Sequence, residues 1–147
     1  VADVEILAKV TSHDTGDDLL ARIYARAGGT ASHEAGYVVG LSHNGITDII
    51  AFYYYDPASH ALIDVREANF IWSENSWYWF RFRLIGNSLQ VRVWADGNAE
   101  PAAWTIETTN SAISSAGWVG FGGNSPTDDP YCDYFAVGLN GASAPAP

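Results

Sequence analysis

Tryptophan and arginine side chains recur at alternate positions in the segment 77–94, WYWFRFRLIGNSLQVRVW. Successive side chains of a strand point to opposite faces, so these residues are expected to share one face. Its members are Trp77, Trp79, Arg81, Arg83, Gln90, Arg92 and Trp94. Tryptophan presents a flat apolar ring with one donor, and arginine offers fixed donors to hydroxyl or carboxylate groups. The combination suits a sugar ligand; the alternative is a second buried layer whose arginines pair with acidic residues elsewhere in the fold.

The segment is predicted to form a β-hairpin, because Gly86-Asn87 separates two runs that are rich in aromatic and β-branched residues. With this turn, the opposite face pairs apolar side chains across the two strands and is expected to lie in the core. These pairs are Leu84 with Leu89, Phe82 with Val91, Phe80 with Val93 and Tyr78 with Ala95. The same register places Arg81 opposite Arg92, and like charges in that arrangement are destabilising. A neighbouring carboxylate, stacking on tryptophan or a ligand is therefore expected to compensate.

A neighbouring strand is expected over residues 20–27, where Arg22, Tyr24 and Arg26 occupy alternate positions. Placed beside the hairpin, Arg22 and Tyr24 would extend the tryptophan–arginine face. A further aromatic group at residues 52–55, FYYY, points two side chains to each face of its strand. Its tyrosines either extend a sugar platform or lie in the core with satisfied hydroxyls.

The usual catalytic patterns are missing from the sequence. The E-x-D-x-x-E motif of glucanases would place two carboxylates in one cleft at the ~5–5.5 Å that retaining hydrolysis requires, and it does not occur here. Asp64 and Glu67 are expected on opposite faces of their strand. The four histidines lack zinc-ligand spacing, and His43 is expected in a turn. The G-x-S-x-G motif of serine hydrolases does not occur. Cys132 is expected to be a small core residue. The sequence therefore favours a binding module over an enzyme.

Length and charge narrow the functional classes further. A chain of 147 residues is most simply one domain, expected over residues 1–140, and the Ala/Pro/Ser-rich residues 141–147 resemble a linker. The formal net charge of −10 disfavours nucleic acid and anionic membrane surfaces as partners. No apolar run approaches the ~20 residues of a membrane-spanning helix. Low charge content with many Gly, Ser and Thr residues is typical of loop-rich extracellular β proteins.

About ten short strands account for most of the chain, at intervals typical of an antiparallel sandwich or barrel. Only residues 111–116 are expected to form a helical turn, and no fixed-period repeat suggests a propeller. The expected strands cover residues 4–10, 20–27, 35–41, 46–55, 61–66, 77–85, 88–95, 104–108, 117–121 and 131–137.

The spacing W-Y-x-x-R-x-x-x-x-G-N-x-L-x-x-x-x-W over residues 77–94 resembles the concanavalin A-like/laminin G-like jelly-roll superfamily, closest to its bacterial branch related to 3-keto-disaccharide hydrolases. Other segments carry the resemblance along nearly the whole chain: Asp96-Gly97, Glu100-Pro101 and Trp104, then DVEILAKV at 3–10, LAR at 20–22, GYVV at 36–39, GWVGF at 117–121 and DYFAV at 133–137. The resemblance implies an all-β fold of two stacked, curved antiparallel sheets, with ligands on the concave face or at the loop rim.

In many members the resemblance also implies a structural Ca²⁺ near the paired terminal strands, here at Asp133 with Asp128, Asp129 or a carbonyl near Asp3. The alternative for Asp133 is a hydrogen-bonded residue at the start of a strand. Carboxylate-rich loops are a common way to hold Ca²⁺, although they are more often simply solvated. The fold hosts lectins, binding modules, glycosidases and adhesion modules. We therefore expect a non-catalytic glycan-binding domain of a modular secreted, surface or phage-particle protein, with Trp79, Arg81, Arg83, Arg92 and Trp94 at the site. A structural or assembly module that uses the same face for protein contacts is the alternative, and a glycoside-processing enzyme is the third class.

Overall fold

The computed structural model describes residues 2–13, 20–30, 33–123 and 129–147, which form ten strands and contain no helix. The strands are β1 (Val4–Ser12), β2 (Arg22–Thr30), β3 (His33–His43), β4 (Asp48–Tyr55), β5 (Leu62–Asn69), β6 (Tyr78–Ile85), β7 (Ser88–Ala95), β8 (Ile106–Thr109), β9 (Trp118–Gly122) and β10 (Pro130–Leu139). Accordingly, no described segment forms a helix that could cross a membrane.

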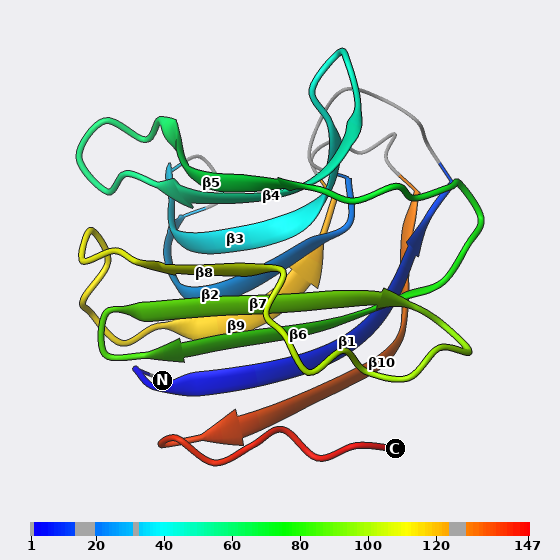
Figure 1. Ribbon diagram of the computed structural model, residues 1–147. Helices are drawn as coiled ribbons and strands as arrows, with labels where there is room; N and C mark the ends of the chain where they lie inside the picture. The colour runs from blue at the N-terminus through cyan, green and yellow to red at the C-terminus, as the bar shows by residue number, and fades with distance from the viewer. Residues whose placement is uncertain (1, 14–19, 31–32, 124–128) are drawn as a thin grey trace.

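Two antiparallel five-stranded sheets pack face to face (Figure 1). Sheet 1 has the order β10-β1-β6-β7-β8, and sheet 2 has the order β5-β4-β3-β2-β9. Strands β1 and β10, from the two ends of the chain, pair directly. This arrangement confirms the prediction of an all-β jelly-roll sandwich.

The core lies between the sheets and follows the period-2 alternation of the sequence. Phe80 and Phe82 of β6 and Val91 of β7 are fully buried from one side, and Phe52 of β4 enters from the other. The rings of Phe52 and Phe82 meet edge to face with centroids 5.2 Å apart. Each such side chain contributes roughly 1.5–3 kcal/mol by leaving water, so the packing of these faces fixes which side of each strand remains outside.

The central hairpin has the register expected from the sequence, because Ile85 pairs with Ser88 across the Gly86-Asn87 turn. Gly86 has φ of +55°, a conformation that suits glycine in a tight hairpin turn. Arg81 is consequently opposite Arg92, as predicted.

The helical turn expected at residues 111–116 is wrong, because this segment is irregular. The side-chain oxygen of Asn110 accepts a hydrogen bond from the Ala112 amide at 2.8 Å, which satisfies the backbone locally without a helix. The Ile113 amide donates to the Tyr37 hydroxyl at 3.2 Å, and the Ile113 side chain is buried in the core. Tertiary contacts therefore determine the path of this connection.

The C-terminal segment, residues 142–147, runs back along the outer side of β10 (Figure 1). The Ala144 amide donates to Glu5 Oε1 at 3.1 Å, and the Tyr134 hydroxyl donates to the Pro145 carbonyl at 2.9 Å. A Cβ at Gly138 would lie 2.2 Å from the Ala142 carbonyl oxygen, so glycine is required for this close approach. The segment that resembles a linker in sequence thus packs on sheet 1.

Candidate functional site

The outer face of sheet 1 is built from two rows of side chains that cross the strands. In the first row, Tyr134 of β10 pairs with Lys9 of β1, which pairs with Trp79 of β6, which pairs with Trp94 of β7. In the second row, Glu5 of β1 pairs with Arg83 of β6, which pairs with Gln90 of β7, and the opposed Arg81 and Arg92 lie between the two rows. All of the expected hairpin members described in these strands remain partly exposed on this face: Trp79, Arg81, Arg83, Gln90, Arg92 and Trp94.

The aromatic row holds Trp79 between its neighbours. Its ring stacks on that of Trp94, with ring centroids 6.2 Å apart and an interplanar angle of 13°. The ring centroid of Tyr134 lies 5.5 Å from that of Trp79 on the other side. The Trp79 indole donates to Asp96 Oδ1 at 2.8 Å, and Lys9 pairs with Asp96 Oδ2 at 2.9 Å. Trp79 is therefore fixed by protein contacts on both sides, so Trp94 is better placed than Trp79 to offer a ring face to a ligand.

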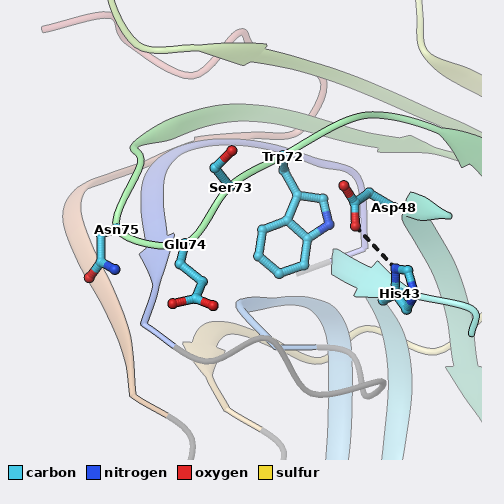
Figure 2. Close-up of a pocket in the computed structure, with 6 residues that line it drawn as sticks. All are labelled: His43, Asp48, Trp72, Ser73, Glu74 and Asn75. Atoms are coloured by element: carbon cyan, nitrogen blue, oxygen red, sulfur yellow. Dashed lines mark hydrogen bonds and ion pairs between the residues drawn. The ribbon is translucent and has the colours of Figure 1, made fainter.

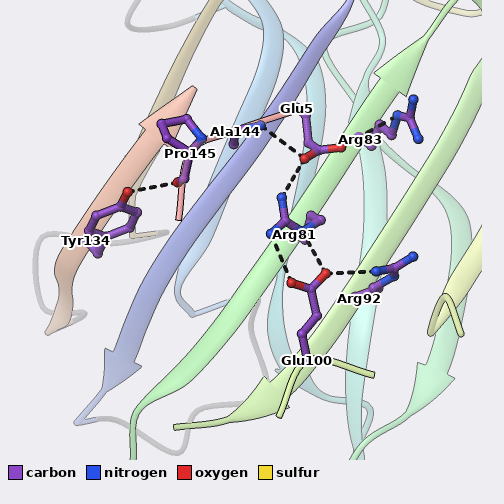
Figure 3. Close-up of polar contacts among 8 residues, drawn as sticks. All are labelled: Glu5, Arg81, Arg83, Arg92, Glu100, Tyr134, Ala144 and Pro145. Carbon is purple, nitrogen blue, oxygen red and sulfur yellow. Dashed lines mark hydrogen bonds and ion pairs between the residues drawn. The ribbon is translucent and has the colours of Figure 1, made fainter. Parts of the chain in front are cut away.

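The arginine pair is compensated by a carboxylate, which is one of the three kinds of compensation expected from the sequence (Figure 3). Glu100 Oε1 accepts from Arg81 Nε at 2.7 Å and from Arg92 Nη1 at 2.8 Å. Its Oε2 accepts from Arg81 Nη2 at 2.9 Å, while Arg81 Nη1 donates to Glu5. The arginines thus pair with acidic residues, as the alternative interpretation expected, but the layer is partly exposed and not buried. Binding of a sugar to this face stays a prediction.

Contacts within this network favour the charged forms of Glu100 and Arg81. Burial alone would raise the pKa of Glu100, but hydrogen bonds and charges from Arg81 and Arg92 outweigh that effect and leave it below its ordinary value. For Arg81, the hydrogen bond to Glu100 is the largest cause that raises the pKa. At neutral pH the network therefore presents charged donors in fixed positions.

A cavity of about 290 Å³ opens on this network, and we call it the Arg–Glu cavity. Its lining is Glu5, Arg81, Arg83, Arg92, Glu100, Trp104, Ser143 and Ala144. The Arg92 guanidinium carbon lies 4.0 Å from the centroid of the Trp104 ring, a cation–π contact that orients both groups. The C-terminal segment supplies one wall, and the connection between β7 and β8 supplies the other. Sequence reasoning did not assign Glu5, Trp104 or the C-terminal segment to the site, because only the pairing of distant strands reveals their proximity.

Arg22 and Tyr24 do not join this face, and their expected placement beside the hairpin is wrong. They belong to β2, which pairs with β3 and β9 in sheet 2, whereas the neighbours of β6 are β1 and β7. Arg22 is buried and donates to the Tyr55 hydroxyl, and the Tyr24 ring lies 5.8 Å from Trp118. These residues form a separate aromatic group on the outer face of sheet 2.

Arg26 has a structural role. Its side chain is 3% exposed and donates to three backbone carbonyls, those of Ala2 at 2.7 Å, Gly86 at 2.6 Å and Ile113 at 2.9 Å. It therefore joins β2 of sheet 2 to the N-terminal segment, to the β6–β7 turn of sheet 1 and to the connection before β9.

The expected Ca²⁺ ligands are not gathered in the part of the chain that the structure describes. Asp133 lies at a register shift of β10 and pairs with Lys9 at 3.3 Å, and Asp129 pairs with His13 at 3.4 Å. Asp128 lies outside the described residues. Among the described residues, no group of three acidic, histidine or cysteine side chains is arranged to hold a metal. Because Asp128 belongs to the predicted ligand set, binding of Ca²⁺ stays a prediction.

A second, larger cavity of about 640 Å³ lies beside the ends of β3 and β4 (Figure 2). His43 Nδ1 contacts Asp48 Oδ1 at 3.1 Å across these strands, so His43 ends a strand and is not a turn residue. The Trp72 indole, which also lines the cavity, donates to the Ser42 carbonyl at 3.0 Å. The contacts of His43 and Trp72 are thus those that hold the strand ends together.

The expectation for Asp64 and Glu67 is also wrong. A register shift in β5 passes over one residue, so that Asp64 pairs with Tyr53 and Glu67 pairs with Ala51 on the same outer face of sheet 2. The Tyr53 hydroxyl donates to Glu67 Oε1 at 3.2 Å. Burial, followed by the negative charges of Glu67 and Asp64, raises the pKa of Tyr53 to about 12. The strand therefore presents two neighbouring, exposed carboxylates on one face, an arrangement that the sequence did not reveal.

The sequence matches no known protein-family model and no curated protein.

Proposed function

We propose that this domain binds carbohydrate, without catalysing its conversion, through the outer face of sheet 1 at the Arg–Glu cavity. The observation that carries the proposal is a solvent-open cavity in which charged guanidinium donors are fixed by two carboxylates beside the Trp104 ring. Sugar recognition uses oriented hydrogen-bonding groups together with an apolar ring face, and this cavity supplies oriented guanidinium donors and the Trp104 ring.

Preorganisation supports the same proposal. Glu100 bridges Arg81 and Arg92, so these side chains lose less conformational freedom when a ligand arrives than free arginines would. Arg83, whose side chain is 37% exposed, lies at the rim of this network and is the most accessible of the three guanidinium groups. In the proposed mode, a sugar ring lies against the exposed aromatic surface while Arg83 and Arg92 donate to its oxygens.

A glycan array probed with the purified domain tests this function. Binding to a defined class of glycan, lost in a Trp104→Ala/Arg83→Gln double variant that still folds, is the expected result. Running the array again with a chelator tests the Ca²⁺ prediction separately, since loss of binding in that arm alone would implicate acidic residues outside the Arg–Glu cavity. Absence of binding to every glycan by the folded domain would contradict the proposal.

A role as an assembly module is the second candidate, and it is favoured by large apolar side chains that are exposed at one edge of the sandwich. Trp118 of β9 is 52% exposed, and Tyr131, Phe135 and Leu139 of β10 are also exposed. Both strands are edge strands, and aromatic side chains are common anchors of protein interfaces. This surface differs from the tryptophan–arginine face, so light scattering of a Phe135→Ser variant distinguishes the two: a change in oligomeric state would support assembly and leave glycan binding unaffected.

A further inference from the structure

The Arg–Glu cavity has more positive than negative charge. Its described lining contains three guanidinium groups, those of Arg81, Arg83 and Arg92, and two carboxylates, those of Glu5 and Glu100. The whole chain carries a formal charge of −10, so a site with a local positive excess stands out against its surroundings. The carboxylates compensate this cluster only in part.

The hydrogen bonds within the cavity identify the uncompensated donors. Arg81 uses Nε, Nη1 and Nη2 for bonds to Glu100 and Glu5. Arg92 shares the Oε1 atom of Glu100 with Arg81, and its own Nε is buried without a partner. Arg83 reaches a carboxylate only at 3.6 Å, from Nε to Glu5 Oε2, which is too long for a hydrogen bond. Because the Arg92 Nε atom is buried, the donors that remain accessible to a ligand are chiefly those of the more exposed Arg83.

Most of the carboxylate acceptors, in contrast, are already in use. Glu5 Oε1 accepts from both Arg81 and the Ala144 amide, and both oxygens of Glu100 accept from arginines. A neutral sugar, whose hydroxyls both donate and accept, would find few free acceptors here. A planar anion would match the surplus of fork-shaped donors, because guanidinium and carboxylate groups form strong paired hydrogen bonds.

We propose, on the basis of the proposed carbohydrate-binding function, that the preferred ligand is a saccharide carrying a single carboxylate, held by Arg83 with Arg92 behind it. The long-range field of a strongly acidic protein repels polyanions such as heavily sulfated chains. One carboxylate in direct contact with guanidinium groups gains more at short range than it loses to that field, because partial burial of the cavity weakens solvent screening.

Isothermal titration calorimetry with three matched probes tests this inference: an oligosaccharide ending in a uronic acid, its methyl ester, and a sulfated oligosaccharide of the same length. We expect the acid to bind at least about tenfold more tightly than the ester, the usual size of a hydrogen bond to a charged group. Arg83→Gln is expected to abolish this preference. Arg66→Gln, which removes the same charge from an exposed position on β5, is the control and keeps it.

Each outcome decides a different question. Equal binding of the acid and the ester would overturn the carboxylate assignment while leaving the carbohydrate-binding function in place. Preference for the sulfated probe would replace the single carboxylate with a polyanion. A preference for the acid that survives Arg83→Gln, in a variant with unchanged circular dichroism, would place the anion elsewhere on the molecule. No binding of any saccharide in the probe set or on the glycan array would overturn both proposals.

Discussion

Removing the charge of Glu100 is expected to destabilise the domain, because Glu100 is the carboxylate between two arginines that lie directly opposite each other on β6 and β7. Three hydrogen bonds of 2.7–2.9 Å join it to Arg81 and Arg92. In Glu100→Gln the amide group keeps one acceptor, but its NH₂ group turns a donor towards an arginine donor. The variant also leaves the Arg81–Arg92 repulsion without its counter-charge.

The magnitude follows from the number of bonds and their exposure. A hydrogen bond to a charged group contributes roughly 1.5–3 kcal/mol, and at least one is lost. The side chains of Arg81, Arg92 and Glu100 are 13%, 22% and 28% exposed, so solvent screens part of this energy. We therefore expect the free energy of unfolding to fall by about 2 kcal/mol.

Urea denaturation measures this loss against a matched control. Glu107→Gln makes the same chemical change at an exposed carboxylate of β8 that accepts from Gln90 at 2.6 Å, and is expected to cost less than about 0.5 kcal/mol. Adding Arg92→Gln to Glu100→Gln removes one of the opposed charges. The loss of unfolding free energy in the double variant should therefore be about 1 kcal/mol smaller than the sum of the losses in the two single variants. A Glu100→Gln variant as stable as the Glu107→Gln control would refute the view that Glu100 compensates the arginine pair.

Three further changes probe other contacts. Arg26→Ala removes the donor of three carbonyls, one of them fully buried, and should lower the free energy of unfolding in urea by about 3 kcal/mol; a loss below about 1 kcal/mol would show that water replaces the guanidinium. Gly138→Ala, with Gly28→Ala in open space as its control, should displace the C-terminal segment and speed hydrogen exchange at the Ala144 amide, and unchanged exchange would contradict the close packing. The pKa of Glu100 is below its ordinary 4.5 when folded, so its contribution is present above pH 4.5 and is lost as pH falls further; wild type and Glu100→Gln should therefore converge in stability in acid, and a constant difference down to pH 2 would contradict that shift.

Local alternation was sufficient to predict the hairpin and its two faces. Period-2 patterning places Phe80 and Phe82 in the core and Arg81 outside, whatever the rest of the chain does. The need for a group that compensates Arg81 and Arg92 followed from the same register, with a carboxylate as one of three possibilities. Its identity did not, because Glu100 reaches the arginines through the path of the β7–β8 connection, which no short sequence pattern specifies.

Contacts between distant strands account for what the sequence could not predict. The alternation of Arg22 and Tyr24 is equally compatible with either sheet, and only the pairing of β2 with β3 and β9 assigns them to sheet 2. A single-residue register shift in β5 reverses the expected relation of Asp64 and Glu67. Such bulges depend on how neighbouring strands fit together and have weak sequence signals of their own.

The most direct test of the central claim is a ¹H–¹⁵N correlation titration of the domain with the best-bound glycan from the array. Carbohydrate binding at the Arg–Glu cavity predicts that the largest shifts fall on the backbone and side-chain signals of Arg83, Arg92 and Trp104, with smaller ones at Ala144. Shifts confined to Tyr24, Tyr55 and Trp118 on the outer face of sheet 2, or no shift at any concentration up to the millimolar range, would contradict it.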